Sequence, residues 1–146
     1  MKTLTIGDLK ARIPIIQGGM GVGISLSGLA SAVANEGGIG VISAAGLGLL
    51  YKKLSPSNYT EAGNLGLAEE IRKAREKAKG IIGVNVMVAL SDFAELVKTS
   101  IAEKVDIIFS GAGLPLDLPS FLKKDSVTKL VPIVSSARAV RIICEK

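Results

Sequence analysis

The sequence has no histidine and only one cysteine among its 146 residues. Without histidine, a histidine general base, a Ser-His-Asp triad and a histidine-rich metal site are excluded for this chain. The single Cys144 has no partner for an internal disulfide and cannot build a zinc site alone, which favours a reducing, cytoplasmic location. We therefore predict no metal site and no catalytic histidine within these residues.

Aromatic residues and long apolar runs are also scarce. No run approaches the roughly 20 apolar residues of a membrane span, and the first ten residues lack the apolar core of a signal peptide. Aromatic residues make up 3% of the chain, and its net charge of +5 comes from basic residues spread among acidic ones. This pattern is typical of a solvated surface, so we expect neither a membrane nor a nucleic acid as partner.

Apolar residues, by contrast, account for 48% of the sequence, and glycine occurs 17 times. This balance suits a parallel α/β protein with strands buried on both faces, and the length suits one domain. We predict strands at residues 13–17, 39–44, 81–88, 105–109 and 130–134, and helices at residues 25–35, 65–79, 92–104, 118–124 and 136–146. Residues 4–12 are expected to form a lid or lead-in, and residues 47–63 a long irregular stretch.

The most distinctive stretch is residues 14–25, where an apolar run ends at Gln17 and four glycines follow within six residues. We predict that a helix begins near Ser25, a residue type that caps helices. Bare backbone between a strand and a helix is where a flat or phosphorylated cofactor lies against main-chain groups. The alternative is a βα turn that needs glycine only for its backbone angles.

Alternating strands and helices imply a parallel sheet, either doubly wound or part of a (β/α)8 barrel. Against a dinucleotide-binding sheet, Ile24 stands where G-x-G-x-x-G needs its last glycine or alanine, and no acidic residue ends the second strand. The barrel fits better, because small or polar residues end the first four strands and would line one mouth. These residues are Gln17, Ser43, Asn85 and Ser110.

Four short motifs occur in order along the chain: Pro14-Ile15-Ile16-Gln17-Gly18-Gly19-Met20, Gly37-Gly38-Ile39-Gly40-Val41-Ile42, Gly83-Val84-Asn85-Val86-Met87 and Ser110-Gly111-Ala112-Gly113. Together they resemble the nitronate monooxygenase family, which is 2-nitropropane dioxygenase-like and includes FMN-dependent enoyl-ACP reductases. The resemblance runs from about residue 13 to residue 146.

This resemblance implies a TIM barrel that binds FMN at its C-terminal mouth, with residues 1–146 as a partial domain of about five βα units. The implied cofactor-binding residues lie after the first strand and on the third. They are Gly19, Met20, Gly21, Asn85 and Met87. Residues implied on the substrate side are Ser110, Gly111, Ala112, Gly113 and Ser135.

The implied function is FMN-dependent oxidation of alkyl nitronates by O2. An FMN-dependent enoyl-ACP reductase and an inactive half-barrel are the alternatives, so the expected partner is a small molecule, either a nitronate or an enoyl thioester. The family's catalytic histidine follows the sixth strand and so lies beyond Lys146. Unpaired strands at both sheet edges are a liability. We therefore expect the rest of the barrel in a longer polypeptide, a completing chain or a homo-oligomer.

Overall fold

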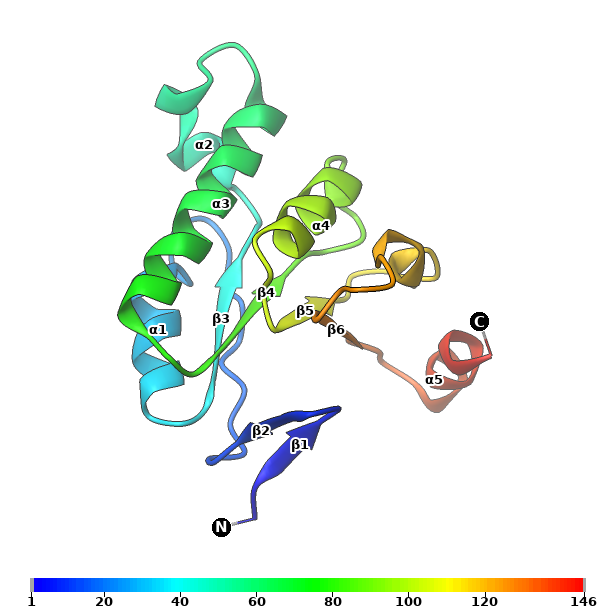
Figure 1. Ribbon diagram of the computed structural model, residues 1–146. Coiled ribbons are helices and arrows are strands. Elements are labelled where there is room, and N and C mark those ends of the chain that lie inside the picture. Colours follow the sequence, from blue (N-terminus) through cyan, green and yellow to red (C-terminus); the bar gives the residue numbers. More distant parts are fainter. Residues whose placement is uncertain (1, 146) are drawn as a thin grey trace.

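The computed structural model describes residues 2–145 of the chain. After an N-terminal pair of strands, its elements alternate between strands and helices (Figure 1). The strands are β1 (Leu4–Ile6), β2 (Leu9–Ala11), β3 (Ile39–Ser43), β4 (Ile81–Asn85), β5 (Ile107–Ser110) and β6 (Lys129–Pro132). The helices are α1 (Ser27–Asn35), α2 (Leu47–Leu50), α3 (Tyr59–Lys77), α4 (Phe93–Ala102) and α5 (Ala137–Cys144), with the 3-10 turns η1 (Lys52–Leu54) and η2 (Leu118–Phe121).

The main sheet is parallel, with its strands in the order β3-β4-β5-β6. Residues 13–17 extend along the free edge of β3. There the N–H of Ile39 donates to the oxygen of Ile15 at 2.9 Å, and the N–H of Gln17 donates to the oxygen of Ile39 at 3.0 Å. Ile16 and Ile39 form a single parallel bridge, so the predicted first strand is present as a short extended segment. Spatial order follows chain order, which confirms the α/β prediction.

The two faces of this sheet bury different partners. Successive side chains of a strand point to opposite faces. One set packs with α1, α3 and α4 on what we call the helical face, and the other packs with β1 and β2 on the hairpin face. The helical face includes Ile42, Ile82, Val84 and Ile108, and the hairpin face includes Ile39, Val41, Ile107 and Phe109. Both faces are therefore covered, as parallel strands require.

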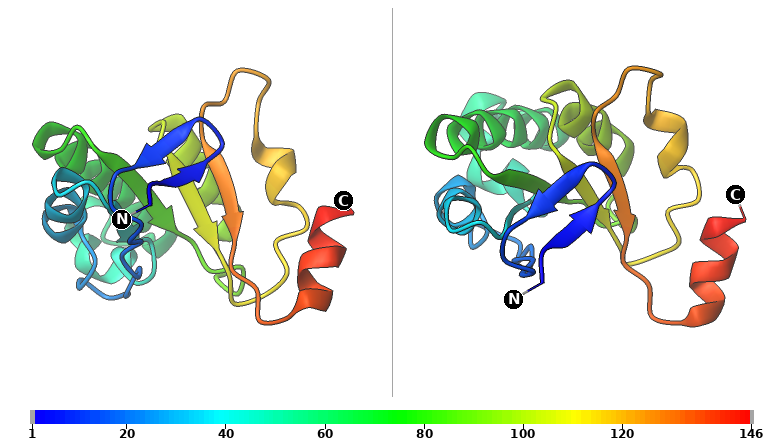
Figure 2. Two further views of the ribbon diagram at one scale, coloured as in Figure 1. Left: turned by 90° about the horizontal axis from the view of Figure 1, so that it is seen from below. Right: turned by 60° about the horizontal axis from the view of Figure 1, so that its bottom comes forward.

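The first residues form an antiparallel hairpin ahead of residues 13–17, a regular structure that the expectation of a lid or lead-in did not specify. Figure 2 shows this hairpin lying across the face of the sheet that the helices leave free. Asp8, at the hairpin turn, pairs with Lys129 of β6 through a contact of 2.6 Å between Oδ1 and Nζ. The hydrogen bond from Lys129 lowers the pKa of Asp8. The hairpin is thus attached to the edge strand as well as to the apolar face.

Residues 47–63 hold more regular structure than the sequence suggested, because α2 and η1 follow β3 and α3 begins at Tyr59 instead of residue 65. Asn58 caps α3, since its Oδ1 accepts a hydrogen bond of 3.0 Å from the N–H of Glu61. A glycine at position 66 weakens the helical pattern of the sequence. Packing requires it, because a Cβ on Gly66 would lie 2.5 Å from the ring of Tyr51.

Other element boundaries differ by a few residues from the prediction. β4 ends at Asn85, η2 is a 3-10 turn, and Asp92 rather than Ser91 precedes α4. α5 stands clear of the sheet in Figure 1, and the predicted end of this helix at Lys146 lies outside the described residues. Among the helices described, none is long and apolar enough to cross a membrane.

Close contact between β3 and α1 depends on Gly40. A Cβ at this position would lie 1.8 Å from the main-chain oxygen of Ala30, so the helix backbone rests directly on the strand. Gly28, in the first turn of the same helix, has nothing within 4 Å of the place a Cβ would take.

We predict that Gly40→Ala lowers the free energy of unfolding by about 3 kcal/mol or more, because α1 must move off the sheet. Gly28→Ala is the matched control and should be neutral or stabilising by up to about 1 kcal/mol. Urea unfolding followed by circular dichroism measures both values. Equal stabilities for the two variants would contradict the close packing of α1 on β3.

Candidate functional site

Residues 18–25, which we call the glycine loop, leave the sheet directly after Gln17. The Gln17 side chain takes the next position of the β ladder: its Nε2 donates to the oxygen of Val41 at 3.0 Å, and its Oε1 accepts from the N–H of Val41 at 3.1 Å. A paired backbone residue would make the same kind of bonds to β3. Because the side chain satisfies β3, the main chain is free to turn away.

Ser25 is buried and fixes the conformation of the glycine loop. Its Oγ accepts hydrogen bonds of 3.0 Å from the N–H of Met20 and from Nε2 of Gln17. The same Oγ donates to the oxygen of Gly18, also at 3.0 Å. The sequence suggested Ser25 as a helix cap, but α1 begins at Ser27 and no side chain caps it from the preceding residue. The serine therefore closes the loop instead of capping the helix.

A buried carboxylate holds the start of α1. Glu70 of α3 accepts a hydrogen bond of 2.6 Å from the N–H of Ser27, in the first turn where helix N–H groups lack partners. Its second oxygen accepts from the hydroxyl of Tyr51 and lies 3.5 Å from Nζ of Lys73. A negative charge at a helix N-terminus is also favoured by the helix dipole. Glu70 thus replaces a local cap and fixes the far end of the glycine loop.

The same contacts shift two pKa values. Burial raises the pKa of Glu70, but hydrogen bonds from Tyr51 and Ser27 and the charge of Lys73 outweigh burial, so the net pKa lies below its usual 4.5. Burial, together with the neighbouring Glu70, raises the pKa of Tyr51 to about 12. At neutral pH the carboxylate therefore stays ionised and the phenol keeps its proton.

Two predicted cofactor-binding residues, Gly19 and Asn85, are in contact. Asn85 ends β4, and its Nδ2 lies 3.4 Å from the main-chain oxygen of Gly19. A Cβ on Gly19 would lie 2.5 Å from the Cβ of Asn85, so the loop rests on the strand end only because position 19 is glycine. Main-chain groups of the loop and the amide of Asn85 therefore meet at the C-terminal ends of β3 and β4.

The other predicted cofactor-binding residues surround this contact. Gly21 lies over the segment after β3, where a Cβ would approach the Cβ of Ala45 to 3.1 Å. The side chain of Met20 is 65% exposed on the glycine loop. Met87 is half-buried just beyond the end of β4. The structure thus gathers Gly19, Gly21 and Asn85 closely and leaves Met20 accessible to a ligand.

Ser43 was not selected from the sequence as a ligand contact, although it was noted at a strand end. It pairs in register with Asn85 across β3 and β4 and is only 3% exposed. Within residues 2–145 its hydroxyl has no hydrogen-bond partner. Leaving a buried polar group unsatisfied costs about 1–3 kcal/mol. Ser43 becomes a candidate ligand contact only once the register of β3 with β4 is known, and the sequence alone does not give that register.

Four of the five predicted substrate-side residues divide into two groups, and the fifth, Gly111, accepts a main-chain hydrogen bond of 2.8 Å from the N–H of Val88. Ala112, Gly113 and Ser135 border one hollow of about 310 Å³ beside the C-terminal ends of β5 and β6. Ser110 is fully buried, and the strand alternation puts its side chain on the helical face with Ile108. Only the main chain of Ser110 is therefore accessible from the ends of the strands.

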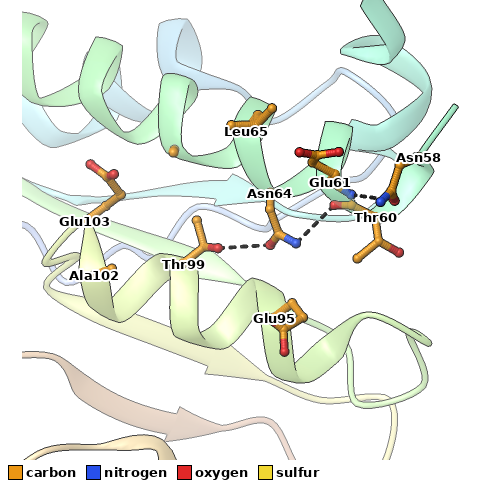
Figure 3. A pocket seen from close by; sticks show the side chains of 10 residues that line it. Asn58, Thr60, Glu61, Asn64, Leu65, Glu95, Thr99, Ala102 and Glu103 are labelled. Atoms are coloured by element: carbon orange, nitrogen blue, oxygen red, sulfur yellow. Dashed lines mark hydrogen bonds between the residues drawn. The ribbon is translucent and has the colours of Figure 1, made fainter. Parts of the chain in front are cut away.

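A hollow of about 570 Å³ lies elsewhere, between α3 and α4 (Figure 3). Its polar side chains are engaged within the protein. Asn64 accepts from Thr99 Oγ1 at 2.9 Å and donates to the oxygen of Thr60 at 3.0 Å, while Glu103 pairs with Arg72. No residue of the glycine loop lines this hollow. We assign no chemistry to it.

Comparison with known proteins agrees with this geometry. The chain matches the family model described as nitronate monooxygenase over residues 2–146. It resembles the solved structure of FabK from Thermotoga maritima, with a TM-score of 0.69 and 28% identity, and that of a point mutant of the same protein, with a TM-score of 0.72 and 30% identity. Both alignments cover 90% of this chain but only 37% and 39% of the FabK chains. No protein of curated function matches.

The glycine loop rests on the C-terminal ends of parallel strands in an α/β fold, the edge at which proteins of this class bind their ligands. With the family match over nearly its whole length, the chain belongs to the nitronate monooxygenase family, a family of FMN-dependent oxidoreductases. It spans well under half the length of the FabK chains that it matches.

We predict that Glu70→Gln lowers the free energy of unfolding at pH 7 by about 1–3 kcal/mol, because the charged acceptor at the start of α1 is lost. The folded-state pKa of Glu70 is lowered, so the stabilisation is fully present above pH 4.5 and disappears as pH falls through the folded pKa. The difference between wild type and variant in urea unfolding, measured at pH 7 and at a second pH below 4.5, should therefore shrink at the lower pH.

Glu69→Gln is the control for this experiment. Glu69 is exposed and pairs with Lys73 at 2.5 Å, so its loss should change stability by less than about 1 kcal/mol. A Glu70→Gln effect that is the same at both pH values would show that the charge of Glu70 does not stabilise the fold.

Proposed function

We propose that this chain forms the FMN-binding, N-terminal part of a (β/α)8 barrel that oxidises alkyl nitronates with O2. In this proposal residues 1–146 are a partial TIM-barrel domain. The family match supports it, as do four parallel strands in chain order with an extended segment beside β3. Consecutive βα units in chain order are how such barrels are built.

The observation that carries the proposal is the contact of the glycine loop with Asn85. It presents main-chain groups and an amide at the C-terminal ends of the strands, where barrel enzymes bind their ligands. Gly19, Met20 and Gly21 would meet the flavin from the loop, and Asn85 and Met87 from the β4 side. The unpartnered Ser43 hydroxyl beside Asn85 fits a polar ligand at this place.

A bound flavin would supply the redox chemistry, taking electrons from the substrate and passing them to O2. The chain's own residues would bind and orient it. We propose the alkyl nitronate anion as substrate, because no proton has to be removed from it before it is oxidised. The segment from Ser110 to Gly113, together with Ser135, would border the substrate, with Ser110 acting through its main chain.

The second candidate is an FMN-dependent enoyl-ACP reductase, which the likeness to FabK favours. The two functions differ in what reduces the flavin. An alkyl nitronate would bleach the flavin in the first case, and NAD(P)H would do so in the second.

The edges of the sheet support completion by further βα units. Ile15 beside β3 and Ile133 after β6 are 55% and 54% exposed, and an unpaired edge accepts additional strands. We propose that the remaining units come from a longer polypeptide, a completing chain or a second copy. Without them the chain would be an inactive half-barrel.

The first test is the visible absorption spectrum of the purified protein, followed by titration with FMN. We expect a flavin spectrum, or its appearance on adding FMN, with quenching of flavin fluorescence at near-equal stoichiometry. Anaerobic addition of an alkyl nitronate should then bleach the flavin. A colourless protein that binds no added FMN would overturn the proposal.

Two neighbouring glycines provide matched variants. Gly19→Ala should weaken FMN binding at least about tenfold, because its Cβ would clash with Asn85 and lift the loop from the strand end. Gly18→Ala should retain most of the affinity, since nothing lies within 4 Å of its Cβ position. Equal affinities for the two variants would show that the contact between Gly19 and Asn85 does not form the site.

A further inference from the structure

Ser43 is buried at the end of β3, and its hydroxyl has no hydrogen-bond partner in the described chain. Its main chain is fixed on both sides: the N–H of Ser43 donates to the oxygen of Ser25 at 2.9 Å, and the N–H of Ala44 donates to the oxygen of Asn85 at 3.0 Å. The main chain of Ser43 is therefore held at the end of β3. A polar group held so firmly without a partner is unusual in a folded protein.

The hydroxyl lies on the ligand side of the sheet. Ser43 shares the face of Ile39 and Val41 and pairs with Asn85, while Gly21 of the glycine loop passes over it. A Cβ on Gly21 would come within 3.7 Å of the Ser43 Oγ. Because position 21 has no side chain, only main-chain atoms of Gly21 lie over this hydroxyl.

We propose that the Ser43 hydroxyl donates a hydrogen bond to the polar edge of the flavin ring. This inference rests on the proposed FMN site and adds to it a residue on β3. Ser43 and Asn85, adjacent on neighbouring strands, would then contact the ring from one side, with the glycine loop shifting to admit it.

The ring is a better partner for Ser43 than the phosphate. Phosphates are bound by helix N-termini and by basic side chains. Ser43 ends a strand, and the nearby N-terminus of α1 already holds the carboxylate of Glu70 on the N–H of Ser27. A second anion would be repelled there, whereas a neutral ring edge at Ser43 would not.

The test compares Ser43→Ala with wild type in the complete protein, using FMN and riboflavin as probes. Fluorescence quenching should show about a fivefold loss of affinity for both probes, since riboflavin has the same ring without the phosphate. The reduction potential of bound FMN should become more negative, because a donor at the ring stabilises the charge gained on reduction. The urea midpoint should stay the same or rise, because no hydrogen bond within the protein is lost.

Ser100→Ala is the control. Ser100 is also fully buried, but its hydroxyl donates to the oxygen of Leu96 within α4, so flavin affinity and potential should not change. If wild type binds flavin and Ser43→Ala binds it equally well, the inference fails while the proposed function stands. A loss seen with FMN alone would indicate a phosphate contact, and a parallel loss of stability would indicate a structural role; either result overturns it. If wild type binds no flavin, the proposed function fails first.

Discussion

The pairing of the Gln17 side chain with the main chain of Val41 is the interaction on which the site depends. An amide side chain carries the same donor and acceptor as a peptide group, so it satisfies β3 where the backbone of residue 18 or 19 otherwise would. If the main chain had continued the ladder, Gly19 would extend along β3 instead of crossing to Asn85. The glycine loop can therefore leave the sheet because the Gln17 side chain pairs with β3 in place of the main chain. Hydrogen bonds of Ser25 then fix the conformation of the loop.

The side chains of the strands change from apolar to polar along their length, and the polar end is the edge at which we propose that the ligand binds. On the hairpin face of β3 the side chains run from Ile39 through Val41 to Ser43, from apolar to polar. The hairpin covers the apolar part, where burial stabilises the fold without directional bonds. On β3 and β4 the polar side chains of this face, Ser43 and Asn85, stand at the C-terminal ends. Burying a polar group there is costly unless it gains a hydrogen-bond partner. The apolar part of the strands therefore stabilises the fold, and their polar ends are suited to a ligand.

Much of this arrangement could be predicted from the sequence, because it depends on local patterns. The alternation of buried strands and helices, the break at Gln17 and the position of Asn85 at a strand end all follow from residue order and burial. What the sequence did not reveal depends on contacts between distant residues. The ring of Tyr51 leaves room only for a glycine at position 66 of α3. Glu70 holds the start of a helix that lies far from it in the sequence. Ser43 is a candidate ligand contact only because the sheet places it beside Asn85. The hairpin was missed because its strands of three residues each are too short for a periodic signal.

The groups at the C-terminal ends of the strands are suited to binding a ligand but not to transferring a proton. In the part of the chain that the structure describes, the polar side chains that meet around the glycine loop are the amides of Gln17 and Asn85 and the hydroxyls of Ser25 and Ser43, together with main-chain groups. These groups orient a neutral ring and its polar edge, but none changes its charge near neutral pH. In the proposed function, proton transfer at this edge would come from residues outside those described, or would be unnecessary because the substrate arrives already ionised. A nitronate anion meets the second condition, which is why the geometry of this chain and the proposed substrate are chemically consistent.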